Sequence, residues 1–230
     1  FDIEKLCWSD EVFETAGIKV SLMAKPVPTG TPAGEITDKA AEQTGLRKDT
    51  VIVSVSHDQI AAAVGAGAFE SSVAVDGAGT VECLTPVYDG IPDMDAMCQG
   101  YFSVVPYVIP GKYVAYAFSY TGGALLQWCS DVLAKKEKEL AEKSGISVNE
   151  YLEKEYSKDF GEEPLSSILV LPHFAGAATP YMDTGSKGAI IGLTADTSVA
   201  EIYRGCMEGV VYEMYLNMKA IKKAGINFQK

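Results

Sequence analysis

A carboxylate and an amide stand directly after an apolar stretch of the chain. Asp58 and Gln59 follow the mostly β-branched residues 51–55 and precede a run of Ala, Val, Ile and Gly. Ligands commonly bind where strands of an open α/β sheet end, so Asp58 is a candidate general base. Gln59 supplies a donor and an acceptor that suit a polyhydroxy ligand. An Asp at this place is also a routine helix N-cap, and that alternative stays open.

Two glycine-containing turns follow. In the first, Gly79 and Thr80 can bring backbone N–H groups and a hydroxyl close to an anion, because glycine has no Cβ in the way. This turn matches neither the Walker A pattern nor the dinucleotide fingerprint, and it could equally be a tight turn between strands. The second turn contains Gly123 and precedes Gln127; by its residues alone it is an ordinary helix start.

Composition excludes several classes of partner. The 230 residues carry a formal net charge of −12, with no clustered basic stripe, so neither nucleic acid nor an anionic membrane is expected as a partner. The five cysteines are odd in number and widely spaced, which indicates a reducing compartment and hence the cytoplasm. His57 and His173 are the only histidines and lie far apart in sequence, so no histidine-based metal site is predicted.

No apolar stretch reaches the roughly 18 uncharged residues that a membrane-spanning helix needs. The chain begins at Phe1, within what reads as a loop followed by a helix, so we expect a fragment or a processed chain.

The elements that must position these residues alternate between helix and strand. Ser9 and Thr37 are expected to cap helices over residues 10–16 and up to 44. Residues 51–55 predict a buried, parallel strand, and residues 60–68 predict a buried helix packed on a sheet.

Further elements follow the same pattern. Strands are predicted over residues 73–75, 81–84, 113–119 and 168–171, and a helix over 124–134. Residues 135–163 are dominated by charge and predict a solvated helical excursion that contains a capping box at Ser147. Ser198 opens a long helix with periodic apolar residues that ends at Gly225. This order predicts an α/β layer architecture.

In combination, these motifs resemble the FGGY carbohydrate kinases, the group that contains glycerol kinase and xylulokinase. The resemblance covers nearly the whole chain, and its most specific part runs from Gly188 to Leu193 and on to Glu201 and Glu208. It implies an actin-like ATPase (ribonuclease H-like) fold, a mixed sheet with flanking helices, here incomplete. Residues 1–58 would end the N-terminal domain, and 59–230 would form a truncated C-terminal domain.

The resemblance also implies roles. Asp58 would be the catalytic base and a substrate contact, with Gln59 as a second substrate contact. Gly79 and Thr80 would lie near the terminal phosphates of ATP, and Gly123 and Gln127 would bind the nucleotide. The implied cofactors are ATP and Mg²⁺, and the implied partners are a small sugar or polyol and a possible second copy of the chain.

The chain departs from the family pattern in places. Residues 176–180 read Gly-Ala-Ala-Thr-Pro where many members have Gly-Glu-Arg-Thr-Pro, which argues against a typical xylulokinase. The N-terminal Asp-x-Gly-Thr motif and the late Gly-Gly-rich adenine motif are missing, so the chain by itself is expected to be inactive. Two alternatives stay open: an actin/Hsp70-like ATP-binding module without a sugar substrate, and a non-catalytic sugar-binding or regulatory protein.

Overall fold

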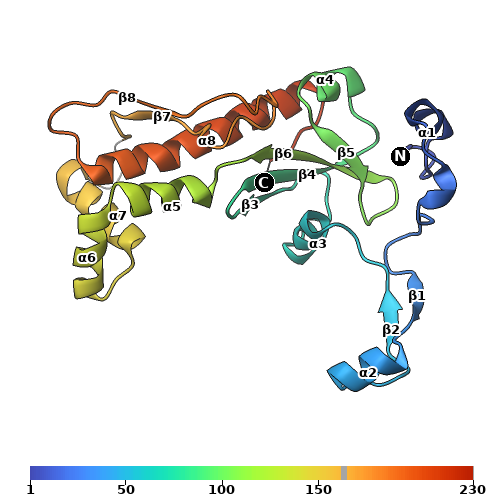
Figure 1. Cartoon of the computed structure of the whole chain (residues 1–230). Helices are drawn as coiled ribbons and strands as arrows, with labels where there is room; N and C mark the ends of the chain where they lie inside the picture. The colour runs from blue at the N-terminus through green and yellow to red at the C-terminus, as the bar shows by residue number, and fades with distance from the viewer. Residues whose placement is uncertain (162–164, 230) are drawn as a thin grey trace.

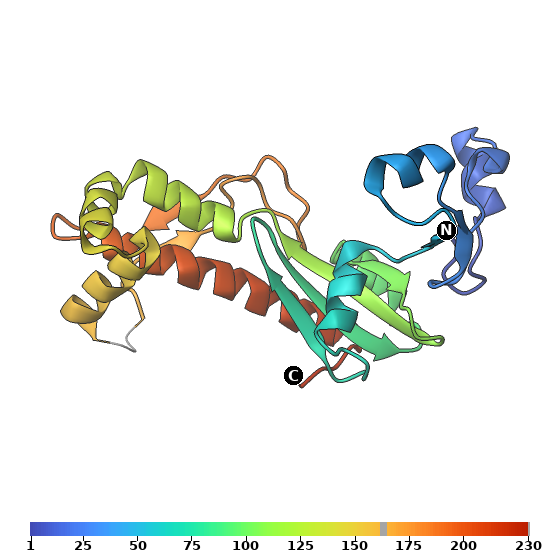
Figure 2. The same ribbon diagram turned by 90° about the horizontal axis from the view of Figure 1, so that it is seen from below.

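A computed structural model describes residues 1–161 and 165–229. The ribbon of residues 1–57 lies to one side of a longer body that runs from α3 to α8 (Figure 1, Figure 2). The two regions differ in packing, because Ala41 is the only buried residue among residues 1–57. The body, in contrast, holds three clusters of buried apolar side chains.

The N-terminal region consists of short elements: α1 (Asp10–Ala16), a 3₁₀ turn (Val20–Leu22), β1 (Pro32–Glu35), α2 (Asp38–Thr44) and β2 (Val51–Val53). The predicted caps are confirmed. Ser9 and Thr37 each accept a hydrogen bond from a backbone N–H in the first turn of their helix, and Gly17 and Gly45 end these helices in the left-handed conformation. Such caps satisfy N–H groups that have no partner within the helix.

Two burial predictions in this part of the chain are wrong. Residues 51–55 were expected as a buried, parallel strand, but β2 covers only Val51–Val53, pairs antiparallel with β1, and is exposed along its length. The helix expected over residues 60–68 is α3 (Asp58–Gly65), in which only Ile60 and Ala63 are buried. Both stretches are apolar in composition, but few neighbouring elements cover them.

The body contains an antiparallel sheet of four strands in the order β3-β4-β6-β5. The strands are β3 (Ala74–Ala78), β4 (Glu82–Asp89), β5 (Ser103–Pro106) and β6 (Lys112–Ser119). One face packs on α4 (Met94–Gln99) and the C-terminal end of α8 (Val199–Lys223), whereas the other packs on α3. The prediction of a sheet flanked by helices is therefore confirmed.

Helices α5 (Gly123–Val132) and α7 (Val148–Phe160) pack on α8, which lies beside the sheet and the hairpin of β7 (Leu169–Leu171) and β8 (Ala189–Ile191) (Figure 1). α5, α7, α8 and β7 share one apolar cluster. Glycines bring α8 very close to β7: a Cβ at Gly209 would lie 2.5 Å from the carbonyl oxygen of Val170. The long helix therefore requires small residues at this contact.

The charged segment forms α6 (Lys135–Ser144) and α7, as predicted, and Ser147 accepts a hydrogen bond from the N–H of Glu150. The end of the predicted segment, at residue 163, lies outside the described residues. Within the described part of the chain, every helix is too short or too polar to cross a membrane.

Candidate functional site

Asp58 lies at the first turn of α3, where its side chain is 85% exposed. Its Oδ1 accepts a hydrogen bond from the N–H of Gln59 at 2.7 Å and lies 3.1 Å from Nδ1 of His57. The side chain that caps α3 is that of His57, at the N-cap position. The N-cap alternative for Asp58 is therefore wrong, since Asp58 is inside the helix and leaves its carboxylate open to solvent.

The start of α3 lies over the sheet that carries the glycine turn. The rings of His57 and Tyr116 of β6 are 5.5 Å apart. Burial raises the pKa of the Tyr116 hydroxyl to about 12, and the nearby charges of Cys83 and Asp58 add to this shift. The Oε1 atom of Gln59 would lie 3.3 Å from a Cβ on Gly77 of β3. At the start of α3, the side chain of Gln59 thus faces β3 and the ring of His57 faces β6.

The turn between β3 and β4 is docked on the start of α5. The carbonyl oxygen of Gly79 accepts a hydrogen bond from the N–H of Gly123 at 2.7 Å, and that of Thr80 accepts from Gly122 and Ala124, each at 3.1 Å. A Cβ on Gly123 would lie 2.8 Å from the Gly79 oxygen, so only glycine permits this approach. Three of the predicted nucleotide residues, distant in sequence, therefore meet in space.

These hydrogen bonds also restrict how an anion could be held. The first N–H groups of α5 already donate to the turn, and the N–H of Gly79 donates to the carbonyl oxygen of Val81 at 3.1 Å. Gly79, Thr80 and Gly123 are all exposed. The surface that they offer is therefore a rigid, glycine-lined turn with the Thr80 hydroxyl, rather than the open end of a helix.

Gln127 lies one turn after Gly123 on α5, and its side chain is on the same face because helix residues four apart are neighbours. It is exposed, and its Nε2 donates to Asp131 at 2.8 Å. Lys138 binds the other oxygen of Asp131 at 3.1 Å. The amide is thus held against Asp131, one turn further along α5.

A pair of carboxyl groups that the sequence motifs did not single out for chemistry lies at the same turn. Glu82 begins β4, directly after the turn, and lies close to Asp76 of β3. Burial, together with the charges of Asp76 and Glu213, raises the pKa of Glu82 to about 7. Only the three-dimensional pairing of the two strands brings these carboxyl groups together. Among the described residues, no group of three or more His, Cys, Asp or Glu side chains could hold a metal ion.

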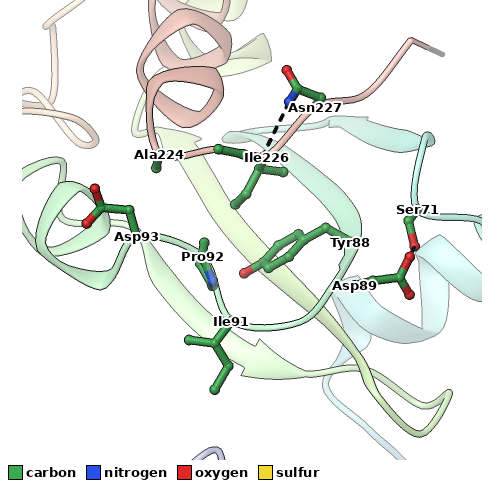
Figure 3. Close-up of a pocket in the computed structure, with 10 residues that line it drawn as sticks. Ser71, Tyr88, Asp89, Ile91, Pro92, Asp93, Ala224, Ile226 and Asn227 are labelled. Carbon is green, nitrogen blue, oxygen red and sulfur yellow. Dashed lines mark hydrogen bonds between the residues drawn. The ribbon is translucent and has the colours of Figure 1, made fainter.

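A pocket of about 420 Å³ lies at the other end of β4 (Figure 3). It is lined by Tyr88 and Asp89 of β4, by the loop that follows, and by residues after α8. Six residues of extended strand separate Tyr88 from Glu82, which corresponds to roughly 20 Å. The pocket is therefore distinct from the surface around Asp58 and the glycine turn.

Comparison with known proteins identifies the family. The model of the C-terminal domain of the FGGY family of carbohydrate kinases matches residues 79–230, and the model of its N-terminal domain matches residues 1–65. The chain belongs to the FGGY family of carbohydrate kinases. The predicted boundary between residues 58 and 59 falls inside the N-terminal match and remains a prediction.

Individual relatives agree with this assignment. A glycerol kinase of Agrobacterium fabrum is 27% identical over 230 residues, which cover 97% of this chain and 41% of that protein. A xylulose kinase structure from Rhodospirillum rubrum superimposes with a TM-score of 0.76 at 20% identity, covering 100% of this chain and 43% of that one. A Plasmodium falciparum glycerol kinase with ADP gives a TM-score of 0.73 at 17% identity, covering 99% and 42% of the two chains.

These likenesses confirm the predicted actin-like ATPase fold. The chain spans about two fifths of the length of the relatives that it matches. The roles of Asp58, Gln59, Gly79, Thr80, Gly123 and Gln127 remain predictions.

Proposed function

We propose that the protein that carries this FGGY chain is an ATP-dependent kinase of a small sugar or polyol. The observation that supports this most strongly is that α3, which carries the exposed carboxylate of Asp58, packs on the same sheet whose β3-β4 turn is hydrogen-bonded to α5. Phosphoryl transfer needs positioning and charge stabilisation above all, with a base for the proton of the attacking hydroxyl. The surface offers a candidate base on α3 and a candidate phosphate-binding turn between β3 and β4.

Asp58 would act as the base. As the substrate oxygen forms its bond to the γ-phosphorus, the bond to the leaving ADP oxygen breaks and the hydroxyl proton passes to a carboxylate oxygen of Asp58. The hydrogen bond from the N–H of Gln59 orients that carboxylate. The side chain of Gln59 would bind a neighbouring substrate hydroxyl. Asp58 also contacts the substrate in this arrangement.

The turn of Gly79 and Thr80 would hold the outer phosphates, with Gly123 keeping the turn close to α5 and Gln127 contacting the nucleotide. ATP supplies the phosphoryl group, and Mg²⁺ neutralises phosphate charge when bound. Mg²⁺ usually takes one or two carboxylates together with phosphate oxygens and waters, so the described residues need not form a complete metal cage.

We further propose a cytoplasmic location, a domain boundary between residues 58 and 59, and a possible homodimer. The first rests on the five unpaired cysteines. The second rests on the change from the sparsely buried residues 1–57 to the packed body. The third has no described contact to support it and is tested by measuring the mass of the protein in solution.

A substrate panel tests the proposed function. The complete gene product is assayed with ATP and a set of pentoses, hexoses and polyols, and each product is identified by mass. We expect one or a few acceptors to gain a single phosphoryl group. The alternative of an actin/Hsp70-like module predicts ATP turnover that no sugar or polyol changes, and that result would rule the proposal out.

A further inference from the structure

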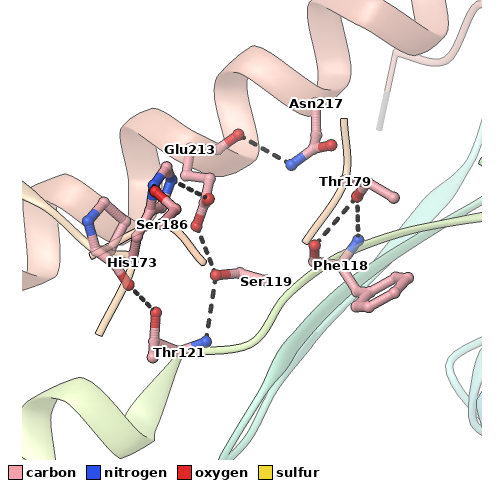
Figure 4. A network of polar contacts seen from close by, with 9 residues as sticks. Phe118, Ser119, Thr121, His173, Thr179, Ser186, Glu213 and Asn217 are labelled. Carbon is pink, nitrogen blue, oxygen red and sulfur yellow. Dashed lines mark hydrogen bonds and ion pairs between the residues drawn. The ribbon is translucent and has the colours of Figure 1, made fainter. Parts of the chain in front are cut away.

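A buried polar network lies between α8, the loop after β7 and the end of β6 (Figure 4). Glu213 of α8 is at its centre, and its side chain is only 4% exposed. One carboxylate oxygen accepts a hydrogen bond from Ser119 Oγ at 2.5 Å, and the other lies 3.0 Å from Nε2 of His173. The Nδ1 atom of His173 is 2.8 Å from Ser186 Oγ. The network thus joins α8 to the loop after β7 and to the end of β6.

The same network reaches the connection between β6 and α5. Ser119 is the last residue of β6, and its Oγ accepts a hydrogen bond from the N–H of Thr121 at 3.3 Å. The hydroxyl of Thr121 in turn donates to the carbonyl oxygen of Pro172. Thr121 directly precedes Gly122 and Gly123, whose N–H groups hold the carbonyl oxygens of the turn. A route of hydrogen bonds therefore leads from Glu213 to Ser119, from Ser119 to Thr121 and, through the adjoining Gly122 and Gly123, to the turn.

A second route runs through the sheet. Ser119 is the register partner of Glu82, the first residue of β4 after the turn. The charge of Glu213 also contributes to the raised pKa of Glu82. The β4 end of the turn and the start of α5 on which the turn is docked consequently both lie next to a single buried serine hydroxyl.

The energetics favour a fixed geometry at this place. A buried polar group that loses its hydrogen-bond partners bears its full desolvation penalty, so separating the Glu213 carboxyl group from Ser119 and His173 is unfavourable. The glycines at the start of α5 have no side chains with which to anchor themselves. Their position must therefore come from neighbours: the carbonyl oxygens of the turn on one side and the Ser119 and Thr121 contacts on the other.

We propose that Glu213, held by His173, is a positioning residue: through Ser119 it fixes the start of α5 and thereby the turn of Gly79 and Thr80. This inference rests on the proposed function, in which that turn holds the nucleotide phosphates. Glu213 itself does not touch the reacting atoms. Its effect is on nucleotide binding, and it leaves the binding of the sugar or polyol unchanged.

The variant Ser119→Ala cuts the route while leaving Glu213 paired with His173. Ser130→Ala is a matched control, because Ser130 is also 1% exposed but bonds Asn149, away from the network. Amide hydrogen exchange of the complete gene product reports on residues 122–124 directly. Because Ser119→Ala removes the hydroxyl that joins Glu213 to Thr121, we expect exchange there to rise about tenfold. The control should exchange like the parent protein.

Nucleotide binding gives a second measurement. We expect the ADP dissociation constant to rise about tenfold in Ser119→Ala, with the KM of the acceptor unchanged, and Ser119→Thr to restore binding because it keeps the hydroxyl. Glu213→Gln keeps the shape of the side chain and one acceptor oxygen, and it serves as a second variant if Ser119→Ala does not fold. We expect Glu213→Gln to raise the ADP dissociation constant as well.

The outcomes separate this inference from the proposed function. If residues 122–124 exchange equally in Ser119→Ala and Ser130→Ala, or if both variants bind ADP like the parent, the positioning role is overturned. A purely structural role predicts lower thermal stability with unchanged ADP binding, which also overturns it. Failure of every acceptor in the substrate panel overturns the kinase function, whereas the exchange of residues 122–124 still decides whether Ser119 positions α5.

Discussion

The two halves of the proposed site differ in how firmly the chain holds them. In the nucleotide half, three backbone hydrogen bonds join the turn of Gly79 and Thr80 to the start of α5. This contact lies next to the buried polar network around Glu213. The substrate half, around Asp58, is exposed and follows a region with a single buried residue. The comparison indicates that the proposed phosphate turn is preorganised by this chain, whereas the proposed base, Asp58, depends little on local packing for its position.

The largest effect in the tied half is expected from Gly123→Ala. The new Cβ would meet the carbonyl oxygen of Gly79 at 2.8 Å and push the turn away from α5. Displacement of binding groups by about 1 Å can cost on the order of 100-fold, so we expect the ADP dissociation constant, measured by calorimetry, to rise about 10- to 100-fold. Gly65→Ala is the control, because a Cβ there meets nothing within 4 Å. Unchanged ADP binding in Gly123→Ala would show that the turn is not held by this contact.

Gly209→Ala tests the close packing of α8 on β7. Helix propensity alone predicts that Gly→Ala within a helix stabilises by up to about 1 kcal/mol. Here the Cβ would lie 2.5 Å from the Val170 carbonyl oxygen, so overpacking should dominate and lower the free energy of unfolding by about 1–3 kcal/mol. Denaturant unfolding of the variant beside Gly65→Ala measures the difference. A more stable Gly209→Ala protein would contradict the close packing of α8 on β7.

Glu82 makes the stability of the tied half depend on pH. Its pKa is raised in the folded protein to about 7, mainly by burial. The folded state therefore keeps a proton that the unfolded state has lost. The stabilisation is complete below the unfolded pKa of about 4.3 and is lost as pH rises through about 7.

Glu82→Gln should remove this loss of stability between pH 5 and 8. The melting temperature at the two pH values measures it, with Glu142→Gln on the exposed face of α6 as the control. Because Glu82 is only partly buried, solvent screening keeps the effect small. An equal drop in melting temperature for Glu82→Gln and the parent would assign the dependence to other groups.

The exposed half should respond to substitution in activity but hardly in stability. Gln59→Ala removes the proposed substrate contact, and we expect the acceptor KM to rise several-fold, as for loss of one neutral hydrogen bond. The free energy of unfolding should change by less than about 0.5 kcal/mol. Gln43→Ala, on the exposed surface of α2, is the control. An unchanged KM for Gln59→Ala would remove this residue from the substrate site.

Local signals in the sequence were sufficient for much of the fold. Ser9, Thr37, Ser147 and Ser198 all cap the helices that they were expected to cap. A cap depends on a hydrogen bond to a residue two or three positions away, so its partner is visible in the sequence. The exposure of β2 was not predictable in this way, because whether a strand is buried depends on which elements pack against it. An apolar composition indicates only that the strand could be buried.

The site shows the same division. Asp58 and Gln59 are adjacent, and the sequence alone makes them candidates. Gly79 and Gly123 meet only through the hydrogen bonds between the turn and α5, so the family resemblance, rather than spacing, predicted their common role. The pairing of His173 with Glu213 joins residues 40 positions apart on different elements, and no periodicity or motif indicates it.

The most direct test of the kinase account compares Asp58→Asn with Asp38→Asn. Both carboxylates are the first residue of a helix, and their side chains are 85% and 82% exposed. Turnover is measured on the complete gene product with saturating ATP and the acceptor found in the panel. Loss of a general base predicts a kcat about 10²- to 10⁴-fold lower for Asp58→Asn, with ADP binding intact and Asp38→Asn like the parent. Undiminished turnover by Asp58→Asn would contradict the account.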